Sequence, residues 1–274
     1  MLASRADIDR LDQQLKGCDT RALALREQAG DGPAFADAVL SRGAGCADEA
    51  AWRVRAAQYV LDDGHDARLL ALIDPVATNA ALTPAVRFGY GQALARAGRV
   101  PDATAAFSVL LESPSHGLMA RTALVDLYLS QGDSAAAWQT ATPAVANAPN
   151  HETQVRWLRV GIDAGQARAV LSFVTAQSPG DRGALVAVEA LARLRMGQPA
   201  EAVALFTNLP VDRFEPTDAL AFIDTLDALS GMRPARQAAS RFTRADASWI
   251  EVTARRALLA SRAGDARESS RLSD

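Results

Sequence analysis

Glycine recurs along this chain of 274 residues at nearly constant intervals. Eight glycines lie 32 to 34 residues apart, and they are Gly30, Gly64, Gly98, Gly132, Gly165, Gly197, Gly231 and Gly264. A period of this length is the signature of a chain built from copies of one small structural unit. The recurrence therefore predicts a repeat protein, in which each unit stacks on its neighbours.

The residues around each glycine predict two helices. Before Gly98 the chain reads AVRFGYGQALARA and after it DATAAFSVLLE, both with apolar residues at helical spacing. Prolines follow four of the glycines by two or three residues, at positions 33, 101, 199 and 234. Proline suits the first turn of a new helix, where its missing N–H has no partner to lose. Each unit is therefore predicted to be a helix–turn–helix hairpin, and the chain holds about eight.

Composition agrees with an all-α chain. Apolar residues make up 49% of the sequence, but aromatic residues only 5%, so the core must be built mainly from alanine, leucine and valine. Alanine and leucine favour helix, and no sustained alternation of the kind expected for strands is present. We expect one superhelical domain over residues 1–274.

A helical hairpin of 34 residues resembles the tetratricopeptide repeat, whose motif reads W-x2-L-G-x2-Y, then A-x3-F, then P. The matching residues are Tyr90, Gly91, Leu94, Ala103, Phe107 and Pro114 in the third unit, Leu124, Tyr128, Ala137 and Pro149 in the fourth, and Ala202 and Phe206 in the sixth. The resemblance implies a right-handed α-solenoid of about eight hairpins, in which the small residues let two helices cross closely.

Some positions depart from this pattern. Arginine stands in place of the motif tryptophan at Arg87 and Arg121, and Ala141 replaces the phenylalanine of the fourth unit. The units before Gly64 and after Gly231 match little beyond the turn glycine. A Sel1-type repeat fits less well, and the longer period of HEAT repeats disfavours that family.

The resemblance also implies where a partner would bind. In such arrays the first helix of each hairpin lines a concave groove. Counting back from the turn glycines gives the groove positions Phe88, Gln92, Arg96, Thr122, Asp126, Leu129, Arg159 and Ile162. We expect the three charged members to be exposed. Their mixed chemistry suits a protein, or an extended polar polymer such as a peptide or polysaccharide. The cluster of basic residues with which some family members hold a C-terminal carboxylate is not recognisable.

Charge and hydropathy exclude two kinds of partner. The net charge is −3, and the 29 basic residues, all arginine except Lys16, are interspersed with 32 acidic ones. Without a block of like charges, no nucleic-acid partner is predicted. The longest apolar runs, such as residues 184–188, are far shorter than the roughly 20 residues of a membrane span. The first residues indicate an amphipathic helix, not a secretion signal, which leaves the compartment open.

Two stretches begin like catalytic motifs but do not complete them. GYGQAL (89–94) lacks the third glycine of a dinucleotide fingerprint, and HETQV (151–155) has Val155 in place of the second histidine of a zinc-protease helix. The three histidines, at 65, 116 and 151, are too dispersed in the repeats to form a metal cluster. We predict no catalytic residue, no metal site and no cofactor, and therefore no enzyme.

The two cysteines bear on the cellular compartment. Cys18 lies near the start of the first predicted hairpin and Cys46 just past its end. Since the ends of an antiparallel hairpin are adjacent, a disulfide can form between them, and it would indicate an oxidising compartment. The alternative is two unpaired thiols that pack as small apolar side chains.

The sequence therefore favours a non-enzymatic interaction scaffold. Degenerate alanine- and arginine-rich repeats resemble the periplasmic tetratricopeptide regions of bacterial proteins for exopolysaccharide export and outer-membrane assembly, which implies a periplasmic role of that kind. The alternative is a cytoplasmic adaptor or secretion chaperone.

Overall fold

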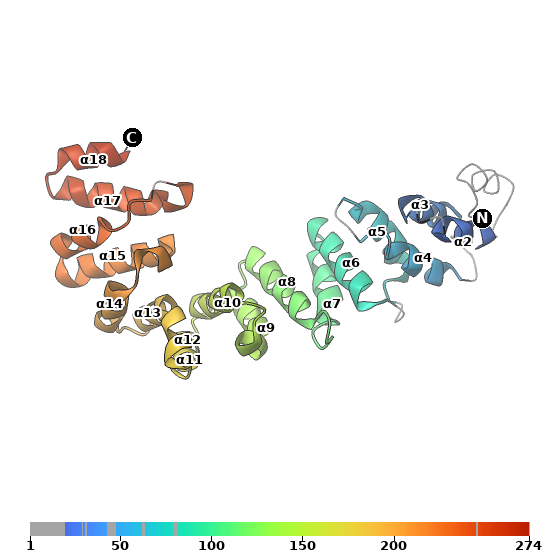
Figure 1. Cartoon of the computed structure of the whole chain (residues 1–274), viewed down its shortest axis with the longest axis horizontal. Coiled ribbons are helices and arrows are strands. Elements are labelled where there is room, and N and C mark those ends of the chain that lie inside the picture. Colours follow the sequence, from blue (N-terminus) through green and yellow to red (C-terminus); the bar gives the residue numbers. More distant parts are fainter. Residues whose placement is uncertain are drawn as a thin grey trace. The chain divides into compact units, whose positions relative to one another are not determined.

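The computed structural model describes residues 20–28, 30, 32–42, 48–61, 64–78, 82–244 and 246–273. Within these residues the chain forms α-helices and short 3-10 helices and has no strand, so the predicted all-α class is confirmed. The helices follow one another as the successive hairpins of an α-solenoid (Figure 1). The chain divides into two compact units, Met1–Ala141 and Thr142–Asp274.

Unit 1 contains four hairpins in its described residues. Its helices are α2 (Thr20–Gln28), α3 (Gly32–Arg42), α4 (Glu49–Ala57), α5 (Asp66–Ile73), η1 (Asp74–Val76), α6 (Pro84–Arg96), α7 (Val100–Ser108), α8 (Gly117–Ser130) and α9 (Ser134–Ala141). The pairs α2–α3, α4–α5, α6–α7 and α8–α9 each pack together as one hairpin. The second helices α3, α5 and α7 also pack against the first helix of the next hairpin, so the core runs continuously through the unit.

Unit 2 contains four more. Its helices are η2 (Thr142–Asn147), α10 (His151–Asp163), α11 (Ala167–Thr175), α12 (Pro179–Ala184), α13 (Val186–Arg195), α14 (Pro199–Asn208), η3 (Val211–Arg213), α15 (Pro216–Ser230), α16 (Met232–Ala239), η4 (Ala247–Trp249), α17 (Ile250–Arg262) and α18 (Ala266–Ser273). The hairpins are α10–α11, α13–α14, α15–α16 and α17–α18. That the two units form one superhelical domain stays a prediction.

The recurring glycines end the first helix of every hairpin. All eight have positive φ, and no other residue type does in the described backbone. At Gly98 (φ +73°), the N–H of Arg99 donates to the carbonyl of Leu94 over 2.9 Å. This bond closes a Schellman motif, which satisfies carbonyls that the helix end leaves without partners. The glycine period is therefore a conformational requirement, because a side chain at positive φ would be strained.

Small residues lie where the helices of a hairpin cross, as the resemblance implies. Ala103 and Ala202 are completely buried. A Cβ atom added to Gly91 would stand 2.7 Å from the ring of Phe107. The space that the motif leaves on one helix is thus filled by the aromatic ring of the other.

Enlarging either buried alanine is expected to destabilise its unit. Ala103→Leu or Ala202→Leu should lower the free energy of unfolding by about 1–3 kcal/mol, because added methylenes overpack a well-filled crossing. Chemical denaturation followed by circular dichroism measures the change. Ala105→Leu and Ala204→Leu are matched controls on the same helices, where both alanines are exposed. Equal midpoints for buried and exposed substitutions would show that the register is wrong.

Arginines at the motif tryptophan position have a structural use. Arg53 donates to the carbonyls of Ala71 (2.8 Å) and Leu72 (3.4 Å), and Arg121 to that of Thr140 (2.6 Å). In both cases the acceptors end the second helix of the same hairpin. The last carbonyls of a helix lack partners within it, and a cation there also interacts favourably with the helix dipole. Arg53 and Arg121 therefore cap the C-terminal ends of the second helices of their own hairpins.

Other arginines join successive hairpins. These ion pairs are Arg55–Glu27, Arg68–Asp37, Arg96–Asp66 and Arg99–Asp74 in unit 1, and Arg236–Asp265, Arg255–Asp224 and Arg262–Asp227 in unit 2. Several are two-pronged, a geometry that arginine provides and lysine does not. Because most are exposed, each adds little stability, but together they fix neighbouring hairpins in register.

Cys18 and Cys46 lie outside the described residues, so the disulfide stays a prediction. No helix in the described part of the chain combines the length and apolar character needed to cross a membrane.

Candidate functional site

The predicted groove residues of unit 1 come from two successive first helices. Phe88, Gln92 and Arg96 lie on α6, and Thr122, Asp126 and Leu129 on α8. Arg96 and Asp126 are exposed, as expected, and the other four are half-buried. Whether these residues bind a partner stays a prediction.

Three of these side chains also have structural contacts. Arg96 binds both carboxylate oxygens of Asp66 at 2.6 Å and thereby lowers the pKa of Asp66. The ring of Phe88 lies 5.5 Å from that of Phe107. The Thr122 hydroxyl donates to the carbonyl of Leu118 over 3.0 Å.

In unit 2 the expected exposure of Arg159 is wrong, and the groove position Ile162 is buried. Ile162 is only 5% exposed and packs in the core. The Arg159 side chain is 17% exposed, and its two terminal nitrogens donate to the two oxygens of Asp218 over 2.8 and 2.6 Å. Asp218 is completely buried. The pairing crosses 59 residues, which is why a reading of local spacing misses it.

The surroundings of Arg159 keep its guanidinium charged. Burial is the largest single effect and lowers the pKa of Arg159, but the hydrogen bonds to Asp218 together with the nearby carboxylates outweigh it, so the pKa of Arg159 is raised. Asp218 also accepts a bond from the N–H of Glu215 (3.2 Å) and completes a capping box at the start of α15. Arg159 on α10 therefore holds the first turn of α15, two hairpins further along the chain.

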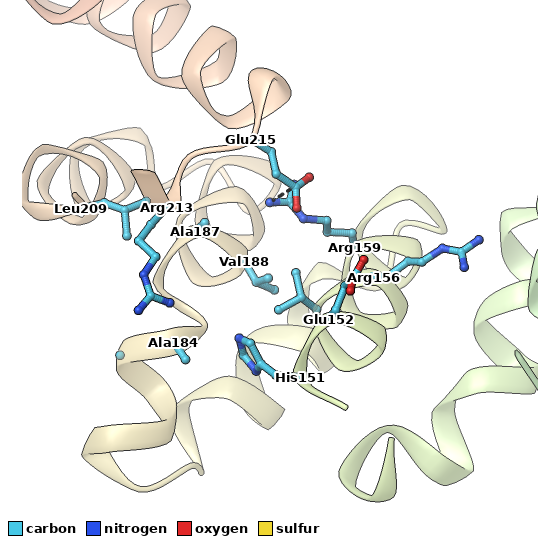
Figure 2. Close-up of a pocket in the computed structure, with 12 residues that line it drawn as sticks. His151, Glu152, Arg156, Arg159, Ala184, Ala187, Val188, Leu209, Arg213 and Glu215 are labelled. Carbon is cyan, nitrogen blue, oxygen red and sulfur yellow. Dashed lines mark ion pairs between the residues drawn. The ribbon is translucent and has the colours of Figure 1, made fainter. Parts of the chain in front are cut away.

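A cavity of about 410 Å³ lies beside this ion pair, and we call it the unit 2 pocket (Figure 2). Its lining residues are His151, Glu152, Val155, Arg156, Arg159, Gly183, Ala184, Ala187, Val188, Leu209, Arg213 and Glu215. They come from α10, from α12 and α13, and from the connection between α14 and α15. Three successive hairpins therefore contribute to one pocket.

The arginines of the pocket differ in their direction and in whether they already have an ion-pair partner. In Figure 2, Arg159 extends toward Glu215, and their charged groups are 3.5 Å apart. Arg156 points away from the other labelled side chains. Arg213 extends from the α14–α15 connection toward Ala184, is exposed, and has no ion-pair partner among the described residues. Arg213 is thus the cation of the pocket with most freedom to contact a ligand.

One wall of the pocket depends on a break in the first helix of the sixth hairpin. That helix is divided at Leu185 into α12 and α13, and Gly183 and Ala184 of α12 form the wall. Ser178 caps α12 through a bond from the N–H of Asp181. The small residues leave the pocket open at this side.

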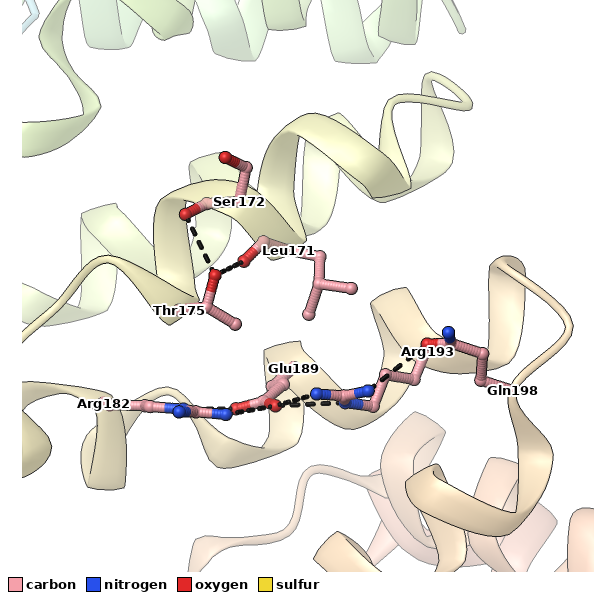
Figure 3. Close-up of polar contacts among 7 residues, drawn as sticks. All are labelled: Leu171, Ser172, Thr175, Arg182, Glu189, Arg193 and Gln198. Carbon is pink, nitrogen blue, oxygen red and sulfur yellow. Dashed lines mark hydrogen bonds and ion pairs between the residues drawn. The ribbon is translucent and has the colours of Figure 1, made fainter.

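A buried carboxylate joins α12 to α13 (Figure 3). Glu189 is 1% exposed and receives two bonds from Arg182, at 2.9 and 2.7 Å, and two from Arg193, at 3.0 and 2.9 Å. Arg193 also donates to the side chain of Gln198 over 3.3 Å. Since Arg182 lies on α12, this cluster fixes the wall that carries Gly183 and Ala184.

Ionised Glu189 is expected to stabilise unit 2 at neutral pH. The bonds from Arg182 lower the pKa of Glu189 below its ordinary 4.5, although burial acts in the opposite direction, and Arg193 adds to the lowering. A carboxyl whose pKa is lower in the folded state adds stability that is complete above the unfolded pKa and is lost as pH falls toward the folded value. Glu189→Gln should therefore cost about 1.5–3 kcal/mol at pH 7, the range for hydrogen bonds to charged groups.

The same variant should differ less from the parent at pH 3. Denaturant midpoints at both pH values measure this, with Glu201→Gln, an exposed substitution on α14, as the control. A constant difference at both pH values would contradict the assigned charge of Glu189.

The geometry of the unit 2 pocket suits binding. It combines apolar atoms of Val155, Ala187 and Val188 with arginine and glutamate side chains at the edge. In the described part of the chain, no three metal-ligating side chains gather into a possible metal site. Sequence reasoning named Arg159 but did not assign the other lining residues to a site. The SPGDRGA segment (178–184) carried a usable signal in its two glycines and its proline.

Comparison with known proteins identifies the fold. No protein-family model matches the chain, and no curated protein sequence matches it. A solved tetratricopeptide repeat protein from Parabacteroides merdae ATCC 43184 superposes with a TM-score of 0.55 at 13% identity, over 81% of this chain and 90% of that one. The chain has a tetratricopeptide-type fold.

The second solved structure is PilF of Pseudomonas aeruginosa, with a TM-score of 0.39 at 17% identity, over 82% of this chain and 89% of that one. A likeness at that score supports no further argument. At such low identity the tetratricopeptide-type fold is what the comparison establishes, and partners and activity do not follow from it.

Proposed function

We propose that this tetratricopeptide-type chain is a non-enzymatic scaffold that binds an extended partner, with the unit 2 pocket as one contact site. One observation carries the proposal: the pocket is lined by α10, α12–α13 and the α14–α15 connection, which belong to successive hairpins. An extended ligand that runs along the repeats would contact such a composite site. The side chains that line the site come from helices and connections that the repeats hold rigid.

The chemistry of the pocket favours a peptide as the partner. Val188 and Ala187 offer apolar contact, and Arg213 offers donors for a carbonyl or carboxylate. Glu152 and Glu215 provide acceptors at the same site. A peptide presents apolar side chains and backbone polar groups at short intervals. This combination matches the apolar residues, the donors and the acceptors of the pocket. An extended polysaccharide is the other polymer for which we propose the site.

The groove residues of unit 1 extend this proposal. Arg96 and Asp126 expose opposite charges on α6 and α8, and Phe88 and Leu129 add half-buried apolar area. We propose that the same partner contacts them.

The proposed setting is the bacterial periplasm, in envelope assembly or exopolysaccharide export. Its support is the resemblance of the repeats and the two cysteines that can close the first hairpin. The alternative setting is the cytoplasm, with a role as adaptor or secretion chaperone.

The cysteines give a direct test of the setting. If the protein works in the periplasm, Cys18 and Cys46 should form a disulfide in protein isolated from the source cells. Mass spectrometry after alkylation without reduction is expected to find both thiols blocked from alkylation. Two alkylated thiols would favour the cytoplasmic alternative.

Photocrosslinking in the source organism tests the binding site. A photoreactive residue placed at Arg213 should form a crosslinked adduct, while one placed at Arg168, an exposed position on α11 outside the pocket, should not. Circular dichroism confirms that both variants are folded. Identical adducts at both positions, or none at Arg213, would place the interaction elsewhere.

A further inference from the structure

A second cavity lies within unit 1, away from the predicted groove residues, and we call it the unit 1 cavity. Its volume is about 540 Å³, within the range of small-ligand sites. Its lining residues are Asp74, Ala77 and Thr78 in and after η1, Arg87 and Tyr90 on α6, and Arg99, Asp102, Ala105, Ala106 and Val109 in and next to α7. The cavity therefore lies between the η1 segment that follows α5 and the hairpin of α6 and α7.

Arg87 differs from its counterparts in the neighbouring hairpins. Arg53 and Arg121 stand one repeat before and after it, and each donates to carbonyls at the end of its own second helix. The corresponding carbonyls for Arg87 belong to Ala105 and Ala106. The Arg87 guanidinium makes no hydrogen bond or ion pair with any described residue, and the half-buried side chain lines the cavity instead.

The other charged groups of the cavity are already paired. Asp74 accepts a bond from the Tyr90 hydroxyl at one oxygen and from Arg99 at the other, both over 2.7 Å. Arg99 also binds Asp102 over 2.9 Å. Burial, together with the bond to Asp74, raises the pKa of Tyr90 to about 12, so its hydroxyl remains a donor. Arg87 is left as the one guanidinium of the cavity without a partner among the described residues.

This pattern defines the ligand chemistry. A planar guanidinium binds a carboxylate through two parallel hydrogen bonds. A dianionic phosphate is less suitable, because Asp74 and Asp102 place two negative charges on the neighbouring wall. Ala77 and Val109 provide apolar surface beside the Arg87 guanidinium. Val109 is 65% exposed, so a bound peptide can contact it.

We propose that the unit 1 cavity binds an acidic side chain of a peptide partner, with the carboxylate on Arg87 and an adjacent apolar residue on Val109. This site adds a second contact to the proposed scaffold function. Its lining comes mainly from the segments in and next to the second helices of two hairpins, and it is specific for acidic segments of the partner. It does not depend on the unit 2 pocket.

Titration of the full chain with short peptides, followed by NMR, tests the proposal. N-acetyl-Glu-Val-amide should shift the backbone amides of Ala105, Ala106 and Val109 in a saturable way. N-acetyl-Gln-Val-amide, which has the same shape without the charge, should bind at least tenfold more weakly. Equal binding of the two peptides, or no saturable shift, would overturn the proposal.

Variants identify the residue responsible. Arg87→Gln should weaken binding of the glutamate peptide at least tenfold, and Arg87→Lys, which keeps the charge but loses the two-pronged geometry, should weaken it severalfold. Arg168→Gln, an exposed change on α11 outside the cavity, is the control and should leave binding unchanged. Unchanged binding by folded Arg87 variants would contradict the assignment, as would saturable binding of sodium glucuronate without binding of the peptide.

Discussion

Replacing Asp218 with alanine is expected to lower the free energy of unfolding of unit 2 by about 3–5 kcal/mol, the usual cost of removing one partner from a buried ion pair. The substitution leaves the guanidinium of Arg159 largely buried without its main partner, and it removes half of the capping box at the start of α15. Chemical denaturation followed by circular dichroism measures the loss.

Two further variants separate the ion pair from the cap. Arg159→Met combined with Asp218→Leu replaces both charges by apolar groups and should cost much less than Asp218→Ala alone. Glu215→Ala removes the cap partner but leaves the Arg159–Asp218 pair, and should cost about 1 kcal/mol. If the double variant were as unstable as Asp218→Ala, an unpaired buried charge would not be the cause.

Phe107→Ala is expected to lower the free energy of unfolding of unit 1 by about 3–5 kcal/mol. The side chain is 1% exposed and fills the space left by Gly91 at the crossing of α6 and α7. Truncating such a ring removes its burial and leaves a cavity. Denaturant midpoints of the variant and the parent give the difference, and the exposed Val109→Ala on the same segment is the control.

A second substitution tests the contact between these two residues. Gly91→Ala alone should destabilise the parent, since its Cβ would lie 2.7 Å from the ring of Phe107. In the Phe107→Ala background the same change should be neutral or stabilising, because the clash is gone and glycine disfavours helix. Equal effects in both backgrounds would show that the two positions are not coupled.

The turns could be predicted from sequence because their cause is local. A helix that must reverse direction needs a residue at positive φ, and glycine supplies it at Gly98 as at the other seven positions. The buried alanines followed from the motif for a similar reason, since the spacing of Ala103 and Phe107 places both on one face of one helix.

The candidate site could be predicted only in part, because its contacts are remote in sequence. Arg159 was placed correctly on a first helix, but its exposure was predicted by counting back from the turn glycine, and its partner Asp218 belongs to a hairpin two repeats away. The pairing of Arg182 with buried Glu189 joins α12 to α13 across the break at Leu185, and the sequence analysis did not predict it. Ile162 was assigned to the groove by counting alone, and in the structure its side chain is buried.

The arginines also have roles that depend on contacts remote in sequence. From the sequence, Arg96 and Arg159 were assigned to the groove, and the other arginines were interpreted only as charges interspersed with acidic residues. In the structure Arg53 and Arg121 cap the second helices, and other arginines pair with carboxylates of the neighbouring hairpin. These roles depend on which helix ends meet, which a count of residues cannot predict.

The central claim is that three successive hairpins of unit 2 hold one partner together. Hydrogen–deuterium exchange of the full chain, with and without the partner identified by crosslinking at Arg213, tests it most directly. The claim predicts joint protection of residues 151–156, 183–188 and 209–215, which contain the pocket lining of all three hairpins. Protection confined to one of these segments, or found only outside unit 2, would contradict it.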